Sequence, residues 1–271
     1  HADPARMKIE AIANDFYNKC IPQSAPAVLF YDEENCIMVR DAAPASCRMW
    51  KEDLLSGIFD FEVAQKTMEA LAIVPNSPEA AAAFANQDIF YQLRISPYFE
   101  FLAGKHPEYK AEIEAMIPKI RDDRRVIVHS DYSPKNILVN ADRSICILDY
   151  EIAHYGNPAF DVAFFTNHIV LKSAHMRQYS AAILNMLTCM TDTYFGMIDF
   201  TDAKELEAGC IPLLGILMLA RIDGKSPAEY ITCEKTRQLV RDMAGELIRG
   251  KLTTYREAAA LLYRMELEFD R

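Results

Sequence analysis

Between residues 126 and 156, the chain sets polar side chains at the ends of three short apolar runs, VIV, ILV and ICIL. Asp131 comes soon after the first run, Asn136 opens the second, and Asp149 follows the third. Short runs of this kind predict strands, and strand ends can hold side chains rigidly beside a cleft. Hard oxygen ligands without Cys or clustered His suit Mg²⁺. A metal together with a spare carboxylate that orients a hydroxyl meets the needs of phosphoryl transfer.

The polar residues of this stretch follow the order H-x-D-x-x-x-x-N and then D-x-E. This order resembles the catalytic core of the aminoglycoside phosphotransferase and choline kinase family, which are small-molecule kinases related in fold to protein kinases. Four segments are similar to segments of bacterial members: HSDYSPKNIL, LDYEIAHYG, NPAFDVAFF and LARIDGKSPAEY. The resemblance implies an α+β, protein-kinase-like fold of the aminoglycoside phosphotransferase type, with a mostly helical C-lobe. It also implies ATP and Mg²⁺ as cofactors.

Five residues of the motif acquire roles through this resemblance. Asp131 is implied to be the catalytic base that takes or positions the proton of the substrate hydroxyl. Asn136 and Asp149 are implied to hold Mg²⁺ against the ATP phosphates. His129 would brace the catalytic loop rather than do chemistry, and Glu151 would contact either the metal or the substrate.

The resemblance also implies supporting and nucleotide-binding residues. Asp161 would anchor the catalytic loop from behind, although an Asp that precedes an apolar helix can simply cap it. Glu10 would be the helix glutamate that pairs with the ATP-binding lysine, although solvent exposure is an equal alternative for a residue with many polar neighbours. The residues near the hinge that meets adenine would be Val39, Arg40 and Asp41.

The chain departs from the family pattern in two places. The family has a phosphate-covering loop and a strand lysine before the glutamate helix, whereas this chain starts almost at that helix, and neither Lys8 nor Lys19 lies on a plausible strand. We therefore expect an incomplete N-lobe in residues 1–43 and a helical C-lobe with the catalytic loop and metal-binding hairpin in residues 44–271. The usual Gly after the motif histidine is Ser130 here, which predicts a slightly different loop geometry.

The elements that must position these residues are mostly helices. Apolar residues at helical spacing predict three helical regions, namely residues 6–19, residues 46–121 and the part after residue 159, including a helix over 233–248. Ser77 and Pro78 have the types of an N-cap and a first helical residue. Two β-type runs on either side of the turn DEEN predict a hairpin over residues 27–40.

Composition excludes some classes of protein. The 271 residues include 39 acidic and 29 basic ones, and the net charge of −10 argues against a nucleic-acid binder. It favours a cationic substrate, although whole-chain charge is weak evidence about a pocket. Seven widely spaced cysteines without C-x-x-C indicate reduced thiols of a cytoplasmic protein. No apolar run approaches the ~20 residues that span a membrane.

These observations lead to one hypothesis and two alternatives. The hypothesis is an ATP-dependent phosphotransferase that phosphorylates a hydroxyl group of a small molecule, either an antibiotic or a metabolite. The first alternative, suggested by the incomplete N-lobe and by Ser130, is a non-catalytic kinase-like binding or scaffold protein. A protein kinase is disfavoured because the chain has no D-F-G or A-P-E segment. The sequence leaves the acceptor and the oligomeric state open.

Overall fold

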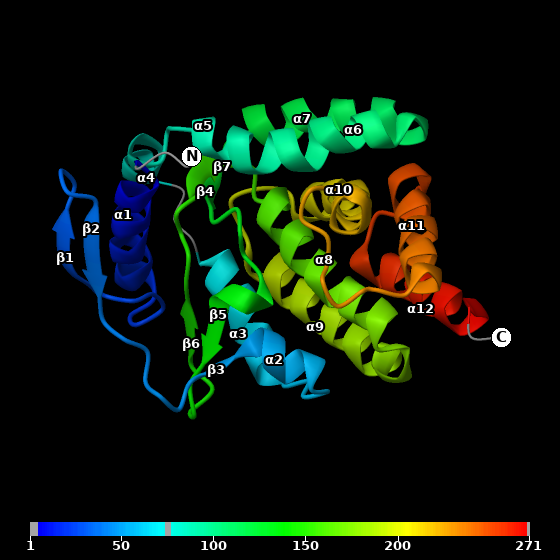
Figure 1. Ribbon diagram of the computed structural model, residues 1–271, viewed down its shortest axis with the longest axis horizontal. Coiled ribbons are helices and arrows are strands. Elements are labelled where there is room, and N and C mark those ends of the chain that lie inside the picture. The colour runs from blue at the N-terminus through cyan, green and yellow to red at the C-terminus, as the bar shows by residue number, and fades with distance from the viewer. Residues whose placement is uncertain (1–4, 74–76, 270–271) are drawn as a thin grey trace.

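The computed structural model describes residues 5–73 and 77–269. Helix α1 (Ala5–Cys20) comes first, and the antiparallel strands β1 (Val28–Asp32) and β2 (Ile37–Arg40) follow it, which confirms the predicted helix and hairpin. Figure 1 shows this hairpin at one edge of the molecule. Helix α1 packs on the body of the protein, since the rings of Tyr17 and Tyr150 lie 4.4 Å apart between centroids.

Two small antiparallel sheets form around the polar stretch identified above. The three strands predicted there are confirmed as β4 (Val126–Val128), β5 (Ile137–Val139) and β6 (Ile145–Ile147). Strand β3 (Arg48–Met49) adds to the β5–β6 hairpin, and β7 (His154–Gly156) pairs with β4. Neither β3 nor β7 was predicted, because their sequences, RM and HYG, are not apolar runs like those of β4, β5 and β6.

The region predicted to be mostly helical between residues 46 and 121 is helical apart from β3 and its connections. Its segments are α2 (Trp50–Leu55), α3 (Phe61–Ala72), α4 (Pro78–Ala83), α5 (Asp88–Phe90), the π-helical η1 (Tyr91–Glu100), α6 (Phe101–Lys105), the short 3₁₀ turn η2 (Pro107–Tyr109) and α7 (Lys110–Asp122). The predicted cap is confirmed, because the Ser77 side chain accepts a hydrogen bond from the Ala80 N–H at 3.1 Å and Pro78 opens α4.

The remaining helices form the bulk of the C-terminal part, as predicted. They are α8 (Ala159–His175), α9 (Ser180–Met197), α10 (Ala203–Asp223), α11 (Glu234–Arg249) and α12 (Tyr255–Phe269), with 3₁₀ turns η3 (Pro134–Asn136) and η4 (Arg177–Tyr179) in the loops. The predicted apolar face of α11 is buried and packs on α10. None of the helices in the described ranges combines the length and hydropathy needed to cross a membrane.

Helix α8 forms the centre of this helical region, in contact with α9, α10 and α11 (Figure 1). Every residue from Ala159 to Ala174 is buried, including polar ones. Asp161 lies in its first turn, whereas His168 and Lys172 lie two to three turns later. Buried polar groups are costly unless they are paired, so these side chains mark positions that packing alone does not explain.

Candidate active site

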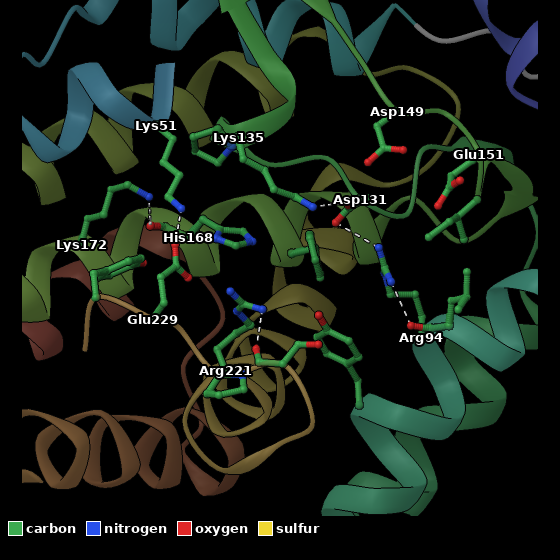
Figure 2. Close-up of a pocket in the computed structure, with 18 of the residues that line it drawn as sticks. Lys51, Arg94, Asp131, Lys135, Asp149, Glu151, His168, Lys172, Arg221 and Glu229 are labelled. Atoms are coloured by element: carbon green, nitrogen blue, oxygen red, sulfur yellow. Dashed lines mark hydrogen bonds and ion pairs between the residues drawn. The ribbon is translucent and has the colours of Figure 1, made fainter. Parts of the chain in front are cut away.

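A cavity of about 480 Å³ lies between the two small sheets and the helices (Figure 2). Its lining comes from the start of α1, from α2, η1, the loop after β4, the segment after β6, α8, and the end of α10 with the loop that follows it. Of the predicted site residues, Asp131, Asp149 and Glu151 line this cavity. The structure thus gathers the carboxylates of the D-x-E segment around the predicted catalytic aspartate.

The carboxylate of Asp131 is buried and held by cations on both oxygens. Arg94 Nη2 lies 3.0 Å from Oδ1, and Lys135 Nζ lies 2.8 Å from Oδ2. The Asn136 side-chain amide donates to the Asp131 main-chain oxygen at 2.9 Å and to Oδ2 at 3.1 Å. Burial raises the pKa of Asp131, but the charges of Arg94 and Lys135 outweigh it and leave this pKa below its usual value. Asp131 is therefore ionised at neutral pH and can accept a hydrogen bond from a hydroxyl.

Asp149 joins this group through the hairpin that follows the loop. The pairing of Ile137 with Ile147 and the hydrogen bond from the Leu148 N–H to the Asn136 carbonyl, 2.8 Å, bring the start of β5 beside the end of β6. As a result, Asn136 Nδ2 lies 3.5 Å from Asp149 Oδ2. Asp149 itself has φ +70°, a left-handed conformation that Asp tolerates better than most residues.

The donor set of Asp131, Asn136 and Asp149 fits a hard divalent cation. The two carboxylates offer oxygens directly, whereas the Asn136 amide nitrogen faces both of them here, and a half-turn of this amide would present its oxygen to the cation. The Asp149 carboxylate has no cationic side chain within ion-pair distance in the described residues. No group of three His, Cys, Asp or Glu side chains with metal-site geometry occurs in residues 5–73 and 77–269. Two carboxylates plus an amide leave several positions open, as in sites where substrate phosphates and water complete the shell of Mg²⁺.

Asp161 supports the loop from the first turn of α8. Its Oδ2 accepts from the His129 backbone N–H at 2.6 Å, and its Oδ1 accepts from the Ser130 N–H at 2.8 Å. The structure therefore favours the loop-anchoring interpretation over simple helix capping. Burial raises the pKa of Asp161 to about 7, and the two backbone hydrogen bonds oppose this effect.

His129 connects the catalytic loop to the metal-binding hairpin. Burial lowers the pKa of His129, so the imidazole is neutral. The ring atom Nε2 lies 2.9 Å from the Leu148 carbonyl oxygen, which can only accept, and Nδ1 lies 3.2 Å from the Asp131 backbone N–H, which can only donate. The proton therefore sits on Nε2. In this tautomer His129 fixes the distance between the chain segments that carry Asp131 and Asp149.

Ser130 adopts φ +70°, the left-handed region in which glycine is common. Ser130 therefore keeps a backbone conformation that glycine can also adopt, and its φ does not become negative. Three contacts hold this conformation: the Asp161 carboxylate, His154 Nδ1 at 2.9 Å from Ser130 Oγ, and Arg94 Nε, which donates to the Ser130 carbonyl at 2.6 Å. Arg94 thus links the loop backbone to the Asp131 carboxylate.

Glu151 and Glu10 lie near the same carboxylates but have arginine partners. Arg6 Nη1 lies 2.7 Å from Glu151 Oε1, and Glu10 is buried and forms an ion pair with Arg40. Burial raises the pKa of both glutamates, and the neighbouring charge of Asp149 adds to this effect. Of the two alternatives left open for Glu10, solvent exposure is excluded, because the side chain is buried and ion-paired. In the described part of the chain its partner is Arg40, and no lysine pairs with it.

The predicted hinge residues are only partly beside a cavity. A second cavity of about 830 Å³ lies between the segment after β2 and the β5–β6 hairpin, and Arg40, Asp41 and Leu148 are among its lining residues. The Asp41 carboxylate accepts from the Ala27 N–H at 2.6 Å. Val39 is exposed and does not line this cavity, so its contact with adenine stays a prediction.

Several cavity residues were not identified from the sequence, namely Arg94, Lys135, Lys51, Lys172 and Glu229. Lys135 follows Asp131 by four residues within the motif, a spacing that could have suggested it. The others lie on helices or loops far away in the sequence, and only the tertiary fold brings them together. Arg221 also lines the cavity, whereas Trp50 is a core residue against Phe165.

Part of the chain matches a known protein family, and its fold is similar to that of solved structures. Residues 73–183 match the phosphotransferase enzyme family. No curated protein sequence matches the chain significantly. Among solved structures, the chain is similar to a choline/ethanolamine kinase family protein from Mesorhizobium loti, at 14% identity and a TM-score of 0.54, over 97% of this chain and 84% of that one.

Two other solved structures are more distant in shape. Ethanolamine kinase from Plasmodium vivax has 13% identity and a TM-score of 0.48, over 97% of this chain and 70% of that one. Choline kinase LicA from Streptococcus pneumoniae has 12% identity and a TM-score of 0.42, over 99% of this chain and 83% of that one.

The resemblance predicted from the sequence is confirmed: the stretch that carries the catalytic-loop motif matches the phosphotransferase enzyme family, and the chain has an α+β, protein-kinase-like fold with a mostly helical C-lobe.

Proposed function

We propose that this protein is an ATP-dependent kinase that phosphorylates a hydroxyl group of a small molecule. One observation carries the proposal: Asn136 Nδ2 lies 3.1 Å from the Asp131 carboxylate and 3.5 Å from the Asp149 carboxylate, and both carboxylates line the first cavity. The family match over residues 73–183, which include all three residues, supports it. The family match does not identify the acceptor or the phosphate donor, so both belong to the proposal.

In this proposal each residue has a defined task. The substrate hydroxyl oxygen bonds to the γ-phosphorus of ATP while the bond from that phosphorus to the β–γ bridging oxygen breaks, and ADP leaves. Asp131 orients the hydroxyl and accepts its proton. Asp149 and Asn136 would hold Mg²⁺, which screens the phosphate charge when bound. His129 and Asp161 hold the loop that presents Asp131.

The nucleotide would lie between the two parts into which we divide the chain, residues 1–43 and 44–271. The second cavity is a candidate for adenine because it adjoins the segment after β2 and shares Leu148 with the metal-binding hairpin. Arg40 and Asp41 line it from the side of the proposed hinge. A cytoplasmic location, where ATP is available, is part of the same proposal.

The proposal is tested by replacing Asp131. We expect Asp131→Asn to lower the rate of ADP production with an accepted alcohol by about 10²–10⁴-fold, because the amide cannot take the proton. Circular dichroism should show an intact fold. Asp199→Asn is the control, because it removes an exposed carboxylate that lines neither cavity. Wild-type turnover by Asp131→Asn would contradict the assignment.

A non-catalytic binding or scaffold protein is the second candidate. One observation favours it, namely that Glu10 pairs with Arg40 and has no lysine partner in the described residues. Calorimetry with Mg·ATP separates the two candidates. Absence of both binding heat and ATP turnover would favour the scaffold.

A further inference from the structure

The end of the cavity opposite Asp149 and Glu151 is basic (Figure 2). Lys172 lies there on α8 with 1% of its surface exposed, and its Nζ donates to the His168 carbonyl at 3.2 Å. It faces the ring of Tyr230 at 5.4 Å from Nζ to the centroid. Within the described residues Lys172 has no ion pair with a carboxylate, although a buried charge without a partner is costly.

Two further cations surround Lys172. Lys51 of α2 forms an ion pair with Glu229, and Arg221 at the end of α10 donates to the Ser226 carbonyl. Among the described lining residues, Glu229 is the carboxylate at this end, and this exposed residue is already paired with Lys51. Burial first, and then Lys51 and Arg221, lower the pKa of Lys172 to about 7, as expected for an amine among like charges.

Several polar atoms in this basic end also lack a partner. His168 Nε2, Arg221 Nε and the Tyr230 hydroxyl are buried without a hydrogen bond in the described structure. His168 itself is 8% exposed, and burial holds its pKa well below the usual value, so the imidazole is neutral. Unsatisfied buried groups that line a cavity point to a ligand that completes them.

The charge of the cavity is opposite to that of the chain. The lining includes six Lys and Arg residues and four Asp and Glu residues, which leaves an excess of two positive charges in a protein of net charge −10. At the end near Asp131 and Glu151 the cations are paired: Arg94 and Lys135 form ion pairs with Asp131, and Arg6 forms one with Glu151. The excess is therefore concentrated around Lys172.

We propose that the acceptor is an alcohol that carries an anionic group, a carboxylate or a phosphate, which binds to Lys172, Arg221 and Lys51 while its hydroxyl faces Asp131. This inference rests on the proposed kinase function and specifies its substrate class. A guanidinium and two ammonium groups suit both anions. The expectation of a cationic substrate, drawn from the whole-chain charge, is replaced, because a cationic alcohol would place its charge beside three like charges.

The test measures binding without nucleotide, by thermal shift. The probes are D-glycerate for a carboxylate, sn-glycerol 3-phosphate for a phosphate, acetate and inorganic phosphate for the anion alone, and glycerol and choline as neutral and cationic alcohols. We expect at least one anionic probe to raise the melting temperature of the wild type, and glycerol and choline to have no effect. The relative affinities of D-glycerate and sn-glycerol 3-phosphate distinguish a carboxylate site from a phosphate site.

Variants locate the binding. Lys172→Met keeps the volume and removes the charge, and we expect it to weaken binding of the anionic probe at least about tenfold. Lys110→Met removes an exposed lysine on α7 that does not line the cavity and should bind like the wild type. If Lys172→Met does not fold, Lys51→Met decides, since the Lys51 side chain is 28% exposed and tolerates truncation.

Each outcome bears on the inference. The inference is overturned if every anionic probe raises the melting temperature of the wild type no more than that of Lys172→Met. It is also overturned if choline, rather than an anionic probe, stabilises the wild type. Failure of the kinase function gives a different result: anionic probes bind through Lys172, yet no phosphoryl group is transferred to any alcohol. Conversely, transfer to choline or glycerol with no anion binding keeps the kinase function and rejects the anionic acceptor.

Discussion

The two ends of the cavity differ in how their charges are compensated. At one end the carboxylate of Asp131 receives two cations and an amide, and its loop is held by the buried Asp161. At the other end the hydrogen-bond partner of Lys172 in the described residues is a carbonyl, and its charged neighbours include two cations. The first end is arranged before any ligand arrives, whereas the second is completed only by a ligand. Preorganised groups suit chemistry, and uncompensated groups suit selection of a substrate.

Among the changes that keep the Asp131 carboxylate, the largest effect should come from removing the preorganisation of the first end. In Asp161→Asn one oxygen becomes an amide that faces a backbone N–H, so the His129 or Ser130 N–H loses its acceptor. We expect the free energy of unfolding to fall by roughly 2 kcal/mol, the cost of a buried unpaired donor. We also expect activity to fall by about 10²-fold because Asp131 is misplaced. Urea unfolding and steady-state kinetics measure both, with Asp199→Asn as the control.

The second end should respond to substitution in the opposite direction. Lys172→Met replaces a buried charge with an apolar side chain of similar length, so we expect the unliganded protein to gain about 1 kcal/mol of stability, as in other trade-offs between stability and function. Binding of an anionic alcohol should weaken in the same variant. A loss of stability in urea would show instead that Lys172 is a structural residue, and the difference between the two ends would disappear.

The pH dependence of stability sharpens the same comparison. The pKa of Lys172 is lowered from 10.5 to about 7, by burial first and then by Lys51 and Arg221, whereas Glu229 raises it and the adjacent His168 is neutral. Between these values the unfolded chain binds more protons than the folded protein, so the stability of the wild type rises with pH relative to Lys172→Met.

A bound anion favours the protonated amine, so its affinity should fall as the pH rises above about 7. Thermal melts of both proteins from about pH 6 to about pH 9, with and without inorganic phosphate, measure this. Parallel curves for the two proteins would mean that Lys172 does not titrate in this range.

The smallest effect should come from Ser130→Gly. Glycine adopts φ +70° without a Cβ penalty, but the hydrogen bond between Ser130 Oγ and His154 is lost. These effects oppose each other, and we expect stability to change by less than about 1 kcal/mol and activity to change by less than about twofold. A large loss of activity would show that the hydroxyl has a role in the catalytic loop beyond its backbone conformation.

Sequence reasoning was most successful where local pattern and structure coincide. The sequence predicted the strands that flank Asp131, Asn136 and Asp149, the helix over residues 6–19 and the cap at Ser77, because each depends on neighbouring residues. The two-residue strand β3 and the π-helical segment η1 were not predicted, since neither has a periodic signal of its own.

The candidate site shows the same division. The oxygen ligands lie within one stretch of 31 residues and were visible from their spacing. Arg94 and Lys172 were not, because a helical Arg or Lys in a sequence looks like a solvated surface residue, and only tertiary packing buries them. Whole-chain charge was misleading for a similar reason: a cavity concentrates a few side chains whose sum differs from that of the surface.

The most direct test combines both ends of the cavity in a single assay. The enzyme is incubated with Mg²⁺ and ATP labelled at the γ-phosphate, together with D-glycerate, sn-glycerol 3-phosphate, glycerol or choline. We predict that the label is transferred to an anionic alcohol and that Asp131→Asn loses this transfer. In Lys172→Met, the fold-increase in KM for the anionic alcohol should exceed the fold-decrease in kcat. Label on choline or glycerol but on neither acid, or label unaffected by Asp131→Asn, would contradict the account.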